Sequence, residues 1–253
     1  MSEQLVKAYL NLHAVLQNLE ELVEHDPEAG AIARKWKLSL QFAVPKGPAV
    51  QIMFRDGRCQ VRPGLKVASD IFLLLATPEH LNKVMDNKGT PILLRGVTRL
   101  PFLLKQFPKL TGRLEQVLKP TAEALKDPAF LALHTRLLLQ TAGFACAVLS
   151  RWDHKGKLAA SRIPDGVVLL KVGDDGPAVH LVSSKGVLSA HKGDYAKPSA
   201  CMKMKDIATA RNFLSGGIDP FTAIALGDVQ ITGQTNMLDS MSLILDRVEH
   251  YLK

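Results

Sequence analysis

The chain has 253 residues and a mass of 27.6 kDa, which suffices for one large domain or two domains of about 125 residues. Its apolar share of 47% and charged share of 22% are ordinary for folded proteins and exclude wholesale disorder. The net charge of +8 suits an anionic partner, but three Tyr and two Trp offer little base stacking, so we expect no nucleic-acid partner.

The first half begins with a helical pattern in which Leu5, Leu12, Leu19 and Val23 recur with a helical period. Asp26-Pro27 predicts its end. Short apolar runs over residues 36–44, 49–54, 58–62 and 69–75 then predict four strands. Asp56-Gly57 predicts a hairpin between the second and third of these strands. Thr77-Pro78-Glu79 predicts the start of a short helix.

The second half repeats this order. Gly47-Pro48-Ala49-Val50 recurs 129 residues later as Gly176-Pro177-Ala178-Val179, and Gly57, Gly64 and Pro91 recur at the same offset without a gap. The shared residues are turn formers, which fix loop geometry. We infer an internal duplication, with one domain over residues 1–125 and the other over residues 126–253.

The pattern of the second half predicts a helix from Pro128, strands over residues 167–172, 178–182, 187–191 and 200–205, and a helix that starts at Asp206. A fifth strand follows over residues 229–232. The closing helix carries Met237, Met241 and Ile244 on one apolar stripe. The expected fold class is α+β, with two tandem modules that each hold a five-stranded mixed sheet covered by helices.

The longest uncharged apolar run, from Leu137 to Ser150, is shorter than the roughly 18 residues of a membrane span and predicts a buried helix. Residues 1–5 lack the pattern of a secretory signal, so we expect a cytoplasmic protein. Cys59, Cys146 and Cys201 have no paired spacing, and the eight His have no metal-ligand spacing. No nucleophile elbow and no suitably spaced pair of carboxylates occurs, so we expect no catalysis, no metal and no cofactor.

Residues 214–233 resemble the sterol carrier protein family. Leu214-Ser215-Gly216-Gly217-Ile218-Asp219-Pro220 looks like the family's helix end, glycine and Asp-Pro, and Gly227-Asp228-Val229-Gln230-Ile231-Thr232-Gly233 looks like its following strand. The likeness covers residues 199–253 without an insertion and extends weakly through residues 167–191. The first half departs from the pattern, because its segment after Pro91 is shorter, and Pro101 and Pro108 interrupt the expected closing helix.

The resemblance implies an apolar tunnel between sheet and helices that holds a fatty acyl chain, acyl-CoA, a phospholipid or a sterol-like ligand. It makes the chain a lipid-binding or lipid-transport protein with a hydrophobic pocket. The lipid-binding candidates are apolar residues of the second half and two of the first: Phe213, Phe221, Ile224, Val229, Ile231, Met237, Met241, Ile244, Leu245, Leu104 and Phe107.

Three functions stay open on the sequence alone. The first is a non-catalytic carrier. Its predicted transient contact with an anionic membrane rests on four basic residues among leucines and phenylalanines: Lys105, Lys109, Arg113 and Lys119. The second is a structural or interaction protein whose pockets have collapsed. The third is an enzyme, or an accessory protein to one, that acts on acyl-CoA or isoprenoid lipids. Fold alone does not choose among them.

Overall fold

The computed structural model describes residues 2–66 and 68–252, which divide into two compact modules, one before and one after the boundary between Lys119 and Pro120. The division falls a few residues before the boundary that the sequence indicated between residues 125 and 126. Each module holds one five-stranded sheet with helices, so the predicted α+β fold class is confirmed.

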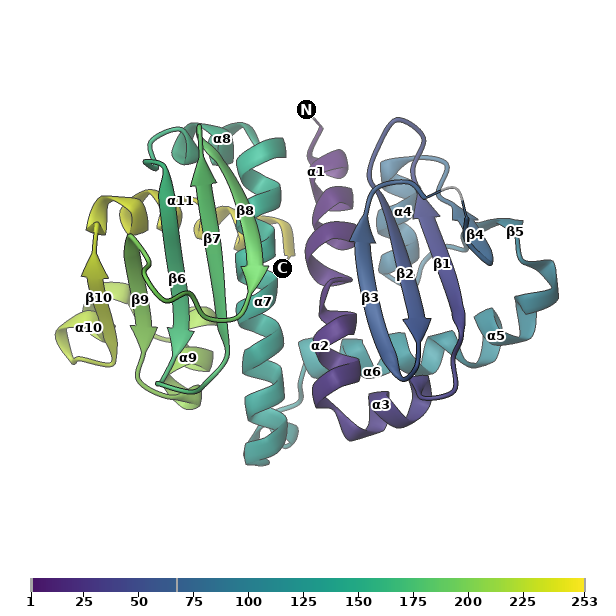
Figure 1. Ribbon diagram of the computed structural model, residues 1–253, viewed down its shortest axis with the longest axis horizontal. Coiled ribbons are helices and arrows are strands. Elements are labelled where there is room, and N and C mark those ends of the chain that lie inside the picture. The colour runs from purple at the N-terminus through teal and green to yellow at the C-terminus, as the bar shows by residue number, and fades with distance from the viewer. Residues whose placement is uncertain (1, 67, 253) are drawn as a thin grey trace. The chain divides into compact units, whose positions relative to one another are not determined.

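The first module holds helices before, between and after the strands of its sheet (Figure 1). Its elements are α1 (Glu3–Leu10), the π-helical turn η1 (Asn11–Val15), α2 (Asn18–His25), α3 (Pro27–Ala33), β1 (Leu38–Ala43), β2 (Ala49–Arg55), β3 (Arg58–Pro63), β4 (Ile71–Leu74), α4 (Pro78–Met85), β5 (Ile92–Arg95), the 3-10 turn η2 (Val97–Arg99), α5 (Leu100–Lys105) and α6 (Phe107–Leu118). The strand order is β3-β2-β1-β4-β5, and the β1–β4 pair is parallel while the other pairs are antiparallel.

The second module repeats this plan. Its elements are the 3-10 turn η3 (Ala124–Lys126), α7 (Pro128–Trp152), α8 (His154–Ala160), β6 (Gly166–Val172), β7 (Ala178–Ser184), β8 (Val187–Lys192), β9 (Ala200–Met204), α9 (Ile207–Leu214), α10 (Pro220–Ala225), β10 (Val229–Gly233) and α11 (Thr235–Leu252). The order β8-β7-β6-β9-β10 corresponds strand for strand to that of the first module, and the β6–β9 pair is again the parallel one.

The hairpin turns of the two sheets have the same geometry 129 residues apart. Asp56 and Gly57 have φ angles of 52° and 75°, and Lys185 and Gly186 have φ angles of 51° and 74°. Two consecutive residues with positive φ match the twist of the strands they connect. The hairpin predicted from Asp56-Gly57 is therefore confirmed.

The apolar side chains on one face of each sheet form part of the core. Leu40 and Phe42 of β1 are buried, as are Val168, Leu170 and Val172 of β6. These side chains share the face on which the helices of their own module pack, because successive side chains in a strand point to opposite faces. The core of each module therefore lies between one sheet face and its helices.

Helix α7 is the core helix of the second module and packs against β7, β8, α9 and α11. Among the described residues it alone is long and apolar enough to cross a membrane by length and composition, which corrects the expectation that no segment would qualify. Since 67% of that apolar window is buried in the structure, the window fits the core helix of a folded domain.

Three further details bear on the expectations. The break at Pro101 and Pro108 is confirmed, because α5 and α6 are separate helices with a proline in the first turn of each. The first predicted helix contains the π-helical turn η1, where the Asn11 side chain donates to Asn82 Oδ1 on α4 at 3.0 Å.

Helix α10 was not predicted, although Asp219-Pro220 is a typical helix start.

The approach of α7 to β7 generates the first prediction. A Cβ atom on Gly143 would lie 2.7 Å from Val179 Cγ2, so Gly143→Ala should lower the free energy of unfolding by about 1–3 kcal/mol despite the better helix propensity of Ala. In the control Gly112→Ala, on α6, the new Cβ would meet no atom within 4 Å, and the change should stabilise by up to about 1 kcal/mol. Urea unfolding of both variants measures this, and equal effects would contradict the packing described.

Candidate functional site

Nine of the eleven lipid-binding candidates are carried by the last four elements of the second module. They are Phe213 on α9, Phe221 and Ile224 on α10, Val229 and Ile231 on β10, and Met237, Met241, Ile244 and Leu245 on α11. Aspartate N-caps begin two of these helices. Asp206 Oδ1 accepts a hydrogen bond from Thr209 N at 2.8 Å at the start of α9, and Asp219 Oδ1 accepts one from Thr222 N at 3.0 Å at the start of α10.

Four of these candidates lie in the interior. Val229, Met237, Met241 and Ile244 have exposed fractions of at most 1%. A side chain with so little accessible surface touches no space that admits a water molecule. These four residues are therefore core in the folded chain, and an apolar ligand would have to displace them to enter.

The other five lie nearer the surface. Phe213, Ile231 and Leu245 are half-buried, whereas Phe221 is 83% exposed and Ile224 is also exposed. Helix α10 contacts β10, so the exposed pair is next to the strand that carries Val229. The structure thus brings an exposed apolar helix close to a buried apolar layer.

Two interior residues of this region were not predicted. Met202 and Met204 of β9 are buried and are the register partners of Ile231 and Val229 on β10. They face the helices, because the intervening Lys203 reaches the exposed Asp174 on the other face. The alternation of Cys201 and Lys203 with the two methionines was the signal that could have identified them.

The interior between β9 and α11 is rich in methionine. Helix α11, which carries Met237 and Met241, packs on β9, which carries Met202 and Met204. Four of the chain's seven methionines are therefore buried on these two packed elements, and are called the methionine layer from here on. Methionine is unbranched and flexible, so a layer of this kind can repack around guests of different shape.

A buried ion pair holds α11 in place. Arg247 on α11 donates to Asp153 Oδ1 through Nη2 at 3.2 Å and to Oδ2 through Nε at 3.4 Å. Tyr251 Oη donates to Asp153 Oδ1 at 2.7 Å, and Gly156 N donates to Oδ2 at 2.8 Å. Asp153 precedes α8, so this network ties the closing helix to the turn between α7 and α8.

The network shifts the titration of its members. Burial alone would raise the pKa of Asp153, but the hydrogen bonds from Arg247, Gly156 and Tyr251 outweigh it, and the pKa lies below its ordinary value. Burial, together with the hydrogen bond to Asp153, raises the pKa of Tyr251 to about 12. The carboxylate is therefore charged and the phenol neutral across the physiological range.

The first module has an equivalent ion pair. Arg113 on α6 donates to Asp26 Oδ2 through Nε at 2.6 Å and to Oδ1 through Nη2 at 3.2 Å. Asp26 is buried and precedes α3, just as Asp153 precedes α8. Each closing helix is thus fixed by a bidentate Arg–Asp pair to the turn that ends the first helical segment of its module.

Aromatic rings fill the interior of the first module. Trp36 stacks edge-on against Phe54 and Phe102, with ring centroids 4.9 and 4.8 Å apart. The candidate Phe107 lies 6.2 Å from Phe42 and is half-buried. The other candidate of this module, Leu104 on α5, is 67% exposed. The structure therefore does not bring Leu104 into the interior with Phe107.

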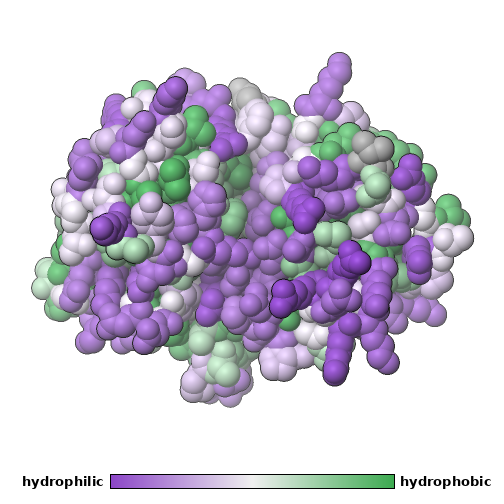
Figure 2. All heavy atoms as spheres, viewed as in Figure 1, coloured by the Kyte–Doolittle hydropathy of each residue, from purple (hydrophilic) through white to green (hydrophobic). Residues whose placement is uncertain are grey.

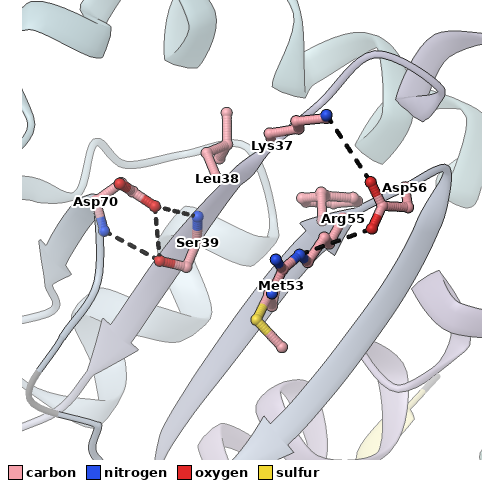
Figure 3. A pocket seen from close by; sticks show the side chains of 8 residues that line it. Lys37, Leu38, Ser39, Met53, Arg55, Asp56 and Asp70 are labelled. Atoms are coloured by element: carbon pink, nitrogen blue, oxygen red, sulfur yellow. Dashed lines mark hydrogen bonds and ion pairs between the residues drawn. The ribbon is translucent and has the colours of Figure 1, made fainter.

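A surface pocket of about 340 Å³ lies in the first module where β1 begins and β2 ends (Figure 3). Its lining is mixed in character and comprises Lys37, Leu38, Ser39, Met53, Phe54, Arg55, Asp56 and Asp70. Asp70 accepts hydrogen bonds from Ser39 N at 2.7 Å and Ser39 Oγ at 2.8 Å, which tie the loop before β4 to β1. With four charged side chains, this pocket does not suit an acyl chain.

The described residues contain one group of three side chains close enough to share a metal ion, namely Glu21, Glu24 and His25 on α2. Glu24 and His25 are exposed, and His25 Nε2 lies 3.4 Å from a Glu21 carboxylate oxygen. Because two of its three side chains are exposed, and such surface groups are common without a metal ion, we assign no metal site to it.

Comparisons with known proteins add the following. No family model and no curated protein matches the chain. Among solved structures, sterol carrier protein 2 is similar at 22% identity and a TM-score of 0.34, covering 44% of this chain and 91% of its own. The ubiquinone synthesis protein UbiJ-SCP2 is similar at 12% identity and a TM-score of 0.35, covering 44% of this chain and 96% of its own.

These neighbours are sterol carrier protein domains, the family that the sequence resembles, and each covers about as much of the chain as one module. A sec-alkylsulfatase from a Pseudomonas species is similar at 16% identity and a TM-score of 0.26, covering 67% of this chain and 30% of its own.

The ion pair in the second module generates the second prediction. Asp153→Asn should lower the free energy of unfolding at pH 7 by about 1–3 kcal/mol, because the part-buried guanidinium of Arg247 loses its counter-charge. Since the folded pKa of Asp153 is depressed, its contribution is present above the unfolded pKa and is lost as the pH falls through the folded pKa. The difference between wild type and variant should therefore narrow below about pH 4.

Chemical denaturation at several pH values makes this measurement. Asp174→Asn, which removes an exposed partner of Lys203, is the matched control and should leave the unfolding midpoint nearly unchanged. A variant D153N as stable as D174N would show that the ion pair does not hold α11.

Proposed function

We propose that the chain is a non-catalytic lipid-binding and transfer protein. In this proposal the second module holds a fatty acyl chain, acyl-CoA, phospholipid or sterol-like ligand between β9 and α11. The observation that supports the proposal is the methionine layer of Met202, Met204, Met237 and Met241, which are all buried on β9 and α11, two elements that pack together.

An acyl chain requires an apolar space that excludes water. Each methylene transferred from water gains roughly 0.8 kcal/mol, so a long chain favours any apolar space that opens for it. The methionine layer supplies apolar walls that can move, because Met has three rotatable bonds in its side chain. The exposed residues Phe221 and Ile224 on α10 offer a first apolar contact next to this layer.

A second candidate function is a structural or interaction protein with collapsed pockets. The specific observation that favours it is the near-zero exposure of Val229, Met237, Met241 and Ile244. The aromatic packing of Trp36, Phe102 and Phe107 favours it for the first module. Uptake of an apolar ligand distinguishes this function from carriage.

A role as an accessory protein of lipid or isoprenoid metabolism would use the same site. It differs from simple carriage in that the bound ligand would be delivered to a separate enzyme. Chemical turnover of a bound thioester by the purified chain would instead show that the chain itself is catalytic.

Titration with the fluorescent fatty acid cis-parinaric acid tests the proposal. Wild type should bind it saturably, and Met241→Trp should weaken binding at least tenfold, because the indole fills the layer that the acyl chain would enter. Met53→Trp is the matched control: Met53 lines the surface pocket of the first module, and its replacement should leave binding within twofold of wild type.

A second variant guards against loss of folding. The double change Met237→Leu and Met241→Leu conserves volume but removes flexibility, so the module should stay folded by circular dichroism while its affinity falls. Absence of saturable uptake by folded wild type would contradict the proposal and favour the interaction protein.

A further inference from the structure

One segment of the first module carries only positive charge. Residues 88–113 contain six Lys or Arg and no Asp or Glu. They form β5, η2, α5 and the first part of α6, and are named the basic edge from here on. Lys88, Arg99, Lys105 and Lys109 are exposed, whereas Arg95 donates to the Ser69 carbonyl oxygen at 3.4 Å and Arg113 pairs with Asp26.

The basic edge also exposes large apolar side chains. β5 is the last strand at one edge of its sheet, so it has a neighbouring strand on one side alone. Figure 2 shows apolar atoms among hydrophilic ones on the side of the first module that β5 and α5 occupy in Figure 1. Five exposed apolar residues fall within Ile92–Leu104: Ile92, Leu94, Val97, Leu100 and Leu104.

The corresponding segment of the second module is apolar too, but its charge is opposite. It exposes Phe221, Ile224 and Leu226. Residues 212–246, however, contain no Lys or Arg and four Asp. Exposed apolar surface is therefore common to both modules, and cationic character belongs to the first.

We propose that the basic edge docks on the surface of an anionic lipid bilayer. Apolar side chains that insert at the level of the headgroups, with Lys and Arg beside them, bind such surfaces through combined burial and attraction. The opposite charge of the second module's segment would be repelled there, so charge complementarity selects the first module. The inference rests on the proposed function, since a carrier must reach a membrane to load or release lipid.

Flotation with large unilamellar vesicles tests this surface with the full-length chain. Wild type should bind vesicles of phosphatidylcholine and phosphatidylglycerol in a two-to-one ratio, should bind pure phosphatidylcholine weakly, and should be released by salt. Val97→Asp should lower the partition at least tenfold, and Arg99→Gln about fivefold. Both positions are exposed, Val97 at 71%, so neither change disturbs the core.

Leu226→Asp is the matched control. Leu226 is 67% exposed and belongs to the acidic segment, so its change should leave vesicle binding within twofold of wild type. Equal binding to neutral and anionic vesicles, or equal loss with Leu226→Asp, would overturn the proposal.

Two further outcomes separate this inference from the function it rests on. If wild type takes up cis-parinaric acid without vesicles but ignores anionic vesicles, the docking surface is refuted and carriage stands. If sedimentation velocity shows self-association that Val97→Asp abolishes, the basic edge binds a second copy of the chain, and the bilayer proposal is refuted in favour of that interface.

Discussion

The bidentate Arg–Asp pair at the base of each closing helix is the constraint on which the rest of each module depends. Asp26 and Asp153 are both about 5% exposed, and each receives two hydrogen bonds from one guanidinium of the closing helix. Buried charges of this kind are tolerated because their hydrogen bonds are satisfied. The pair fixes where α6 and α11 lie against their own modules, and thereby fixes the apolar space beneath them.

The two modules use the same constraint around different interiors. In the first, rings of Trp36, Phe54 and Phe102 pack edge to face, an arrangement with defined geometry and little freedom. In the second, β9 and α11 pack together and each carries two buried methionines, whose side chains adapt to a changed shape. We therefore expect the second module to bind the apolar ligand. The positive surface charge of the first module favours contact with membranes.

Much of the fold could be predicted because it is encoded by neighbours in sequence. Asp56-Gly57 set the hairpin, Thr77 capped α4, and Pro101 and Pro108 separated α5 from α6. The Arg–Asp pairs could not be predicted, because their partners are separated by 87 and 94 residues and neither carries a local pattern. The sequence also could not show how deeply the candidate residues are buried, because the apolar stripe of Met237 and Met241 fits a core helix and a pocket wall equally well.

The central claim is that the second module holds an apolar ligand between β9 and α11. Native mass spectrometry of the purified chain, followed by solvent extraction and identification of the released lipid, tests it most directly. The account predicts one molecule with an acyl, isoprenoid or sterol-like apolar part per chain, since one module has the adaptable interior. A mass equal to the chain alone, with no extractable lipid, would contradict it.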